Sequence, residues 1–123
     1  MGADIHALVE RKIGEKWIMI NRCKGEAMRR NYVRFAALAD VRGDGPSPKG
    51  LPEDLSDSGK LYAEEWDGDA HSHSFLNLDE AAKIFLATDP PSGDWGKKYP
   101  CAYYFDIEDE NAKEHRLVFW FDN

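Results

Sequence analysis

The sequence predicts an α+β fold: a mainly antiparallel sheet built from an N-terminal and a C-terminal hairpin, with two to four helices inserted between them. Strand-like segments lie at both ends of the chain, and amphipathic helical stretches lie between them. The 123 residues suffice for a single domain over 1–123. Hydrophobic residues make up 42% of the chain and aromatic residues 12%, which is enough to fill one core and excludes wholesale disorder.

The first hairpin and the first helix follow directly from residue patterns. Residues 4–10 are typical of a strand, a turn follows at 12–15, and 16–20 form the partner strand. Apolar residues then recur at helical spacing over 31–41, which predicts an amphipathic helix. Gly43 is expected to end that helix.

The middle of the chain predicts a loop, two short helical pieces and one long helix. Glycine and proline are frequent over 44–50, which indicates an exposed loop or lid. Apolar residues over 52–66 have loosely helical spacing, and a Ser-Asp-Ser run and a glycine divide them into two pieces. Asn77 with Glu80 three residues later is a capping-box pattern and predicts a helix over 77–89.

The last third of the chain predicts a polar loop followed by the second hairpin. The loop covers 92–100. Two strands at 101–108 and 114–122 are expected to pair around a tip at 109–113. Residues 117–121 are apolar on both faces of a strand, so this strand should lie centrally in the sheet.

Charge and cysteine content limit the kinds of function that are expected of this chain. Sixteen basic residues against 23 acidic ones give a formal charge of −7, which argues against binding to extended nucleic acid or an anionic membrane. No apolar run approaches the roughly 18 residues that span a bilayer, and no export signal is evident, so a cytoplasmic location is expected. Cys23 and Cys101 lack metal-site spacing and are interpreted as structural thiols.

The densest chemistry lies in one stretch where acidic and histidine residues alternate with small ones. If the backbone is extended there, Asp69, His71 and His73 project from one face. Asp4 and His6 share a face of the first strand in the same way. The two faces are expected to meet in one site.

Three roles fit this cluster, and the spacing leaves them open. Asp69, His71 and His73 have donor atoms that suit a divalent metal such as zinc or manganese, which would activate a bound water. Alternatively His71, His73 and His6 exchange protons at a phosphoester or glycosidic bond without a metal, with Asp69 fixing a tautomer. In the third role the same groups bind a ligand without turnover.

A phosphate-bearing ligand also needs cations and ring faces. Arg29, Arg30 and Asn31 precede the first predicted helix, whose N-terminus favours anions, and Arg42 and Arg116 are further candidates. Tyr32, Trp66, Trp95 and Tyr99 would supply ring faces for stacking. The predicted ligand-binding set is Arg30, Asn31, Tyr32, Trp66 and Arg42.

The motifs taken together resemble a family of small, uncharacterised proteins encoded by bacteriophages, prophages and some bacteria. The resemblance runs from end to end and rests on MGADIH (1–6), RNY (30–32), FAALADVR (35–42), GLP (50–52), GDAHSHSFL (68–76) and VFWFDN (118–123). Ala3 stands where many members have Cys. The resemblance implies a phage protein in the host cytosol, and such proteins often interfere with nucleotide-signalled defence.

The expected function is therefore a phage-type hydrolase of a phosphate-containing small molecule of the nucleotide immune-signal kind. It would be phosphodiesterase-like or metal-assisted. The alternative is a non-catalytic protein that sequesters such a signal, with a homo-oligomer completing its pocket between chains. A third interpretation is an interaction module that blocks a host protein through its acidic surface.

Overall fold

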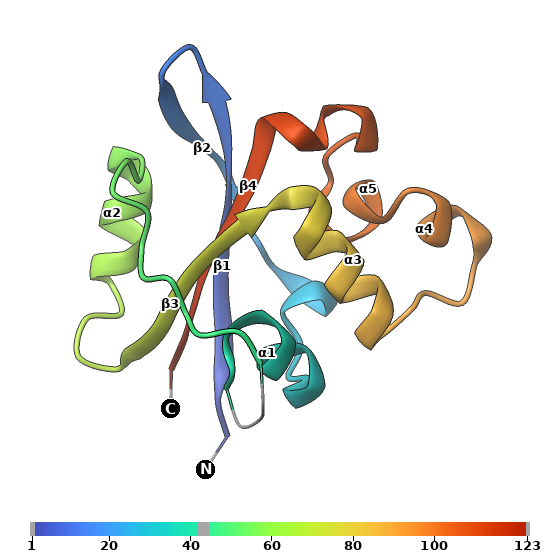
Figure 1. Cartoon of the computed structure of the whole chain (residues 1–123), viewed down its shortest axis with the longest axis horizontal. Coiled ribbons are helices and arrows are strands. Elements are labelled where there is room, and N and C mark those ends of the chain that lie inside the picture. The colour runs from blue at the N-terminus through green and yellow to red at the C-terminus, as the bar shows by residue number, and fades with distance from the viewer. Residues whose placement is uncertain (1, 42–44, 123) are drawn as a thin grey trace.

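The computed structural model describes residues 2–41 and 45–122, and within them a four-stranded antiparallel sheet carries helices on both faces (Figure 1). The strand order is β2-β1-β4-β3. The strands are β1 (Asp4–Ile13), β2 (Lys16–Arg22), β3 (Ala70–Asn77) and β4 (His115–Asp122). The helices are η1 (Gly25–Met28), α1 (Tyr32–Ala39), α2 (Asp57–Glu64), α3 (Leu78–Thr88), α4 (Asp94–Lys98), α5 (Pro100–Phe105) and η2 (Asp109–Glu114). The predicted α+β class is confirmed.

The central position of β4 explains its composition. It pairs with β1 on one side and β3 on the other, so neither edge meets solvent. Residues 115–121 are all buried, as the apolar run 117–121 predicted. The N-terminal hairpin is confirmed as well, since β1 and β2 pair through the turn at Gly14, where φ is +64°.

Two cores lie on opposite faces of the sheet. On one face α1, α3 and α5 cover alternate residues of β1 and β4, and Phe35, Phe85 and Phe119 are fully buried there. On the other face α2 packs over Leu8 and Trp120. Figure 1 shows α2 on one side of the sheet, with α1, α3 and α5 on the other. Burying one such large apolar side chain stabilises the fold by about 1.5–3 kcal/mol.

The predicted C-terminal hairpin is wrong in its first strand. Most of 101–108 belongs to α5, which begins with Pro100 in its first turn. The carboxylate of Asp109 accepts the backbone N–H groups of Cys101 and Ala102, both at 3.1 Å, and so satisfies two donors of that turn. The place beside β4 that was predicted for 101–108 is taken by β3, a strand that is distant in sequence, and the other neighbour of β4 is β1.

The other predicted elements are corrected in detail. The loop predicted over 92–100 contains the short helix α4. The region 52–66 holds one helix, α2, and the Ser56 side chain caps it by accepting the N–H of Gly59 at 3.0 Å. The helix predicted over 77–89 is confirmed as α3, but the Asn77 side chain makes no capping hydrogen bond.

The helix predicted over 31–41 is confirmed as α1. It ends at Asp40, which adopts a left-handed conformation with φ of 59°. Gly43, the predicted stop, lies outside the described residues. The described part of the predicted loop, residues 45–50, has no regular structure.

Candidate functional site

The predicted alignment of Asp69, His71 and His73 on one face is wrong. Alternation fails because β3 contains a bulge, with Ser72 at φ of 56° and a register shift between His71 and Ser74. Asp69 precedes the strand in an exposed turn. The extra residue turns the two histidines to opposite faces of the sheet.

The ring contacts of His71 and His73 show that the two side chains lie on opposite faces of the sheet. The His71 ring stacks on Phe121, with centroids 6.3 Å apart, and Phe121 belongs to the core under α1 and α3. The His73 ring stacks on Trp120 at 5.9 Å, and Trp120 belongs to the core under α2. Among the described residues no group of three or more His, Cys, Asp or Glu side chains is placed to hold a metal ion. Asp69, His71 and His73 therefore form no zinc or manganese site in this arrangement.

His6 and His73 both lie against the Trp120 ring, with centroids 6.5 and 5.9 Å from it, and His6 has two further partners. Its Nε2 lies 3.2 Å from Oδ2 of Asp122, and its ring stacks on Trp66 with centroids 3.7 Å apart. Asp122 joins His6 because β1 and β4 pair antiparallel. Trp66, predicted to stack on a ligand, is thus already stacked on a histidine.

Burial lowers the pKa of His73, and the nearby charge of His71 lowers it further. The neutral imidazole of His73 is therefore favoured at neutral pH. However, none of five well-formed pockets in the described part of the chain is lined by a histidine. His6, His71 and His73 lie against aromatic rings, and none of them lines these five pockets.

The predicted phosphate-holding residues are occupied by structural contacts. Arg30 donates to both carboxylate oxygens of Asp4, at 2.7 and 3.2 Å, and this ion pair lowers the pKa of Asp4. The Asn31 side chain accepts the N–H of Arg34 at 3.0 Å and caps α1. The Tyr32 hydroxyl accepts the N–H of Ala3 at 3.3 Å. Arg42, the last predicted ligand-binding residue, lies outside the described residues.

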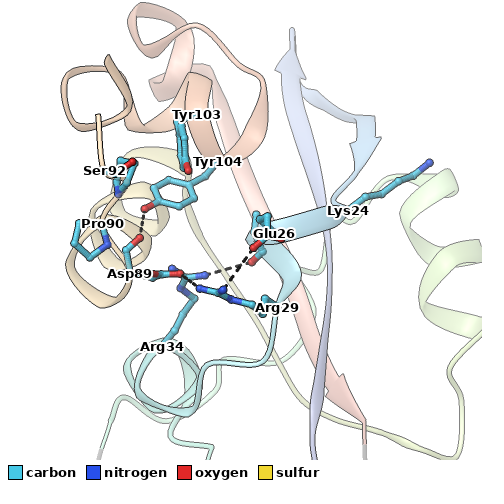
Figure 2. A pocket seen from close by; sticks show the side chains of 11 residues that line it. Lys24, Glu26, Arg29, Arg34, Asp89, Pro90, Ser92, Tyr103 and Tyr104 are labelled. Carbon is cyan, nitrogen blue, oxygen red and sulfur yellow. Dashed lines mark hydrogen bonds and ion pairs between the residues drawn. The ribbon is translucent and has the colours of Figure 1, made fainter. Parts of the chain in front are cut away.

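A different pocket lies where η1, the start of α1, the segment after α3, and α5 meet (Figure 2). We call it the Arg34 pocket. Its volume is about 330 Å³, near the lower end of the range of about 300–1,000 Å³ seen for small-molecule sites. It is lined by Lys24, Glu26, Ala27, Arg29, Arg34, Asp89, Pro90, Pro91, Ser92, Tyr103 and Tyr104.

Arg34 forms part of the wall of this pocket and is only 1% exposed. Its guanidinium donates to the Thr88 hydroxyl at 2.9 Å and to the carbonyl oxygens of Phe85 at 3.0 Å and Ala27 at 3.4 Å. It also lies over the Phe85 ring, with its Cζ 4.1 Å from the centroid. Burial lowers the pKa of Arg34, although an arginine side chain stays protonated in proteins.

No carboxylate in the described part of the chain forms an ion pair with Arg34. Three of its side-chain N–H groups make the hydrogen bonds above. A guanidinium has five such donors, so two remain without a hydrogen bond among the described residues. The pocket thus has a buried cation whose hydrogen bonds go to carbonyl and hydroxyl oxygens, and the nearby Asp89 charge favours its protonated form.

The rest of the pocket adds a second arginine and two rings. Arg29 forms ion pairs with Asp89 and, at 3.6 Å, with Glu26. The Tyr104 hydroxyl donates to the Asp89 carbonyl oxygen at 2.6 Å, and burial raises the pKa of Tyr104. Three basic and two acidic side chains line the pocket, an excess of one positive charge in a chain of −7. In Figure 2 the Lys24 side chain points away from the other labelled side chains of the pocket.

Sequence reasoning missed Arg34, although the sequence contains a signal for it. Arg34 lies four residues before Leu38 and three after Asn31, on the buried stripe of α1. A charged residue on an apolar stripe is unusual and demands partners. The carbonyl and hydroxyl partners of Arg34 come from η1 and α3, so only the folded chain identifies them.

Comparison with protein-family models, curated proteins and solved structures gives no match to this chain. In the described part of the chain no helix is long and apolar enough to cross a membrane. The function therefore has to be argued from the pocket itself.

Proposed function

We propose that this chain binds a small phosphate-bearing molecule of the nucleotide class in the Arg34 pocket and holds it intact. The observation that carries the proposal is the buried Arg34 guanidinium, which lines a cavity without a carboxylate partner among the described residues. Burying a cation is costly unless it is paired and hydrogen-bonded. Carbonyl groups and the nearby Asp89 carboxylate offset part of that cost, and a bound phosphate would add further negative charge beside the guanidinium.

The remaining lining fits the two ends of a nucleotide. Arg29 offers a second guanidinium near the first, and paired arginines suit a phosphate because each presents a planar fork of donors. Tyr103 is 48% exposed and lines the same pocket, so its ring is accessible to a flat base. The cavity of about 330 Å³ suits one nucleotide better than a larger, two-base molecule.

Binding without turnover is favoured by what lines the pocket. No histidine lies there, and Asp89 is engaged by Arg29. A general base must reach the reacting atoms through a hydrogen bond or one water. The resemblance to phage-encoded proteins makes a host nucleotide signal the natural class of ligand for such a protein.

Calorimetric titration with adenosine monophosphate and with inorganic phosphate tests the proposal. The wild-type protein is expected to bind both, and Arg29→Gln and Arg34→Lys should each weaken binding of the nucleotide about tenfold or more, since a charge-assisted hydrogen bond contributes about 1.5–3 kcal/mol. Arg11→Gln is the matched control, because Arg11 is a similarly exposed arginine that pairs with Glu114 outside the pocket. Mass spectrometry of the ligand released by denaturation should return unchanged nucleotide. Absence of binding, or equal binding by all variants, would overturn the proposal.

Hydrolysis of a phosphoester is the second candidate, and the His6–Asp122 pair favours it. A carboxylate that holds one nitrogen of an imidazole fixes the tautomer and leaves the other nitrogen to move a proton. If the chain is a hydrolase, it should turn over a chromogenic phosphodiester, and His6→Gln should abolish this turnover while sparing binding at the Arg34 pocket. Turnover that survives His6→Gln would exclude His6 as its acid or base.

A further inference from the structure

A second pocket has the opposite chemistry to the first and plays no part in the proposed function. It lies between α4, α5 and the start of η2, with a volume of about 320 Å³. We call it the acidic aromatic pocket. It is lined by Trp95, Tyr99, Ala102, Glu108, Asp109 and Glu110.

The rings of this pocket are unusually exposed. Trp95 is 59% and Tyr99 38% accessible, and their centroids lie 6.1 Å apart with the planes inclined at 51°. An exposed pair of large aromatic side chains is costly to keep in water, and such pairs mark interaction surfaces more often than chance. The faces of both rings are electron-rich and attract cations. Lys98 already lies near Tyr99, with its Nζ 5.4 Å from the centroid.

The carboxylates of this pocket carry negative charge that the described residues do not neutralise. Glu108, Asp109 and Glu110 form no ion pair within the described part of the chain. Asp109 accepts two backbone N–H groups of α5, and Glu108 accepts the Asn111 side-chain N–H at 3.4 Å. Neither interaction supplies a counter-charge. Three acidic residues therefore line a cavity beside two rings, with the Asp109 carboxylate held by the first turn of α5.

We infer that the acidic aromatic pocket binds an arginine side chain from a basic segment of a partner protein. A guanidinium is flat and weakly hydrated, so it stacks on Trp95 or Tyr99 and still donates to carboxylates at its edge. A lysine ammonium is compact and strongly hydrated and meets only part of these requirements. Tryptophan and arginine are also the residues that most often dominate the energy of protein interfaces. The partner complements both the charge and the rings of the pocket.

The test uses the full chain and a short peptide of alternating arginine and glycine. Titration followed by NMR should shift the indole N–H of Trp95, and binding should weaken as salt rises. Trp95→Ala should weaken binding about 5- to 30-fold, corresponding to loss of about 1–2 kcal/mol of cation–π and stacking energy. Glu110→Gln should weaken it severalfold. Both side chains are exposed, so both variants are expected to fold.

Controls separate the pocket from the general acidity of the chain. Glu53→Gln removes the same charge at an exposed site outside the pocket and should leave binding unchanged. The matching lysine–glycine peptide should bind several times more weakly than the arginine peptide. Equal binding of both peptides, or of the free polyamine spermine, would overturn the assignment to an arginine segment. Equal binding by Trp95→Ala and Glu53→Gln would overturn the pocket itself.

Discussion

Substituting Asp89 by Asn should strengthen nucleotide binding at the Arg34 pocket, because the Asp89 carboxylate competes with the ligand for Arg29. The Asp89 and Arg29 side chains are 42% and 57% exposed, so solvent screens their ion pair. An exposed pair is worth about 0.2–1 kcal/mol, which the ligand has to replace. Repulsion between Asp89 and a phosphate about 4 Å away adds about 1 kcal/mol in water. Removing both terms gives about 1–2 kcal/mol, or about a 5- to 30-fold higher affinity.

Calorimetric titration of wild type and Asp89→Asn with adenosine monophosphate measures this gain. The Asp89 carbonyl oxygen, which accepts the Tyr104 hydroxyl, is retained in the variant, so the wall of the pocket is preserved. The gain should shrink at high salt because the interactions involved are exposed. Asp94→Asn makes the same charge change outside the pocket and should bind as the wild type does. An affinity for Asp89→Asn that is equal to or below the wild-type value would refute the reasoning.

Three further predictions concern the stability and reactivity of the fold. Arg116→Met should lower the free energy of unfolding in urea by about 3–5 kcal/mol, since it leaves the fully buried Glu10 carboxylate without its ion-pair partner at 2.7 Å; a loss below about 1 kcal/mol would contradict this. Burial lowers the pKa of His73, so the unfolded chain binds a proton at this residue more readily than the folded chain does. The free energy of unfolding should therefore be highest above about pH 6.5 and should decrease below that pH by at most about 1.4 kcal/mol per pH unit. His73→Gln should make the urea midpoint less dependent on pH between about pH 5 and 7. Burial raises the pKa of the Cys101 thiol to about 12, so iodoacetamide at pH 8 should modify it only after unfolding, and rapid labelling of the folded protein would disprove its burial.

The α+β class and much of the element order were predictable because local patterns encode them. β1, β2, α1 and α3 have period-2 or helical spacing within one segment, and β4 is apolar on both faces. The residues 101–108 were assigned to a strand although most of them form α5. That helix is stabilised by Asp109, a residue after its end, which a local pattern does not include.

The candidate site was predicted less well than the fold. The grouping of His71 with His73 assumed strict alternation along β3, and one residue, Ser72, reverses it through the bulge. Asp122 reaches His6 only through the pairing of the first and last strands. Arg34 is visible in the sequence as a charge on an apolar stripe, but its partners are not.

The sequence by itself determined the class of fold, the apolar central strand and the negative charge of the chain, because periodicity and composition are local or additive properties. Tertiary structure decided that His71 and His73 lie on opposite faces of the sheet. It also decided that Arg34 becomes a buried cation beside a cavity, and that Trp95 and Tyr99 stay exposed beside three acidic residues. The physical reason is that side-chain direction, burial and charge pairing depend on which segments meet. A shift of one residue in register reverses them without changing the pattern along the chain.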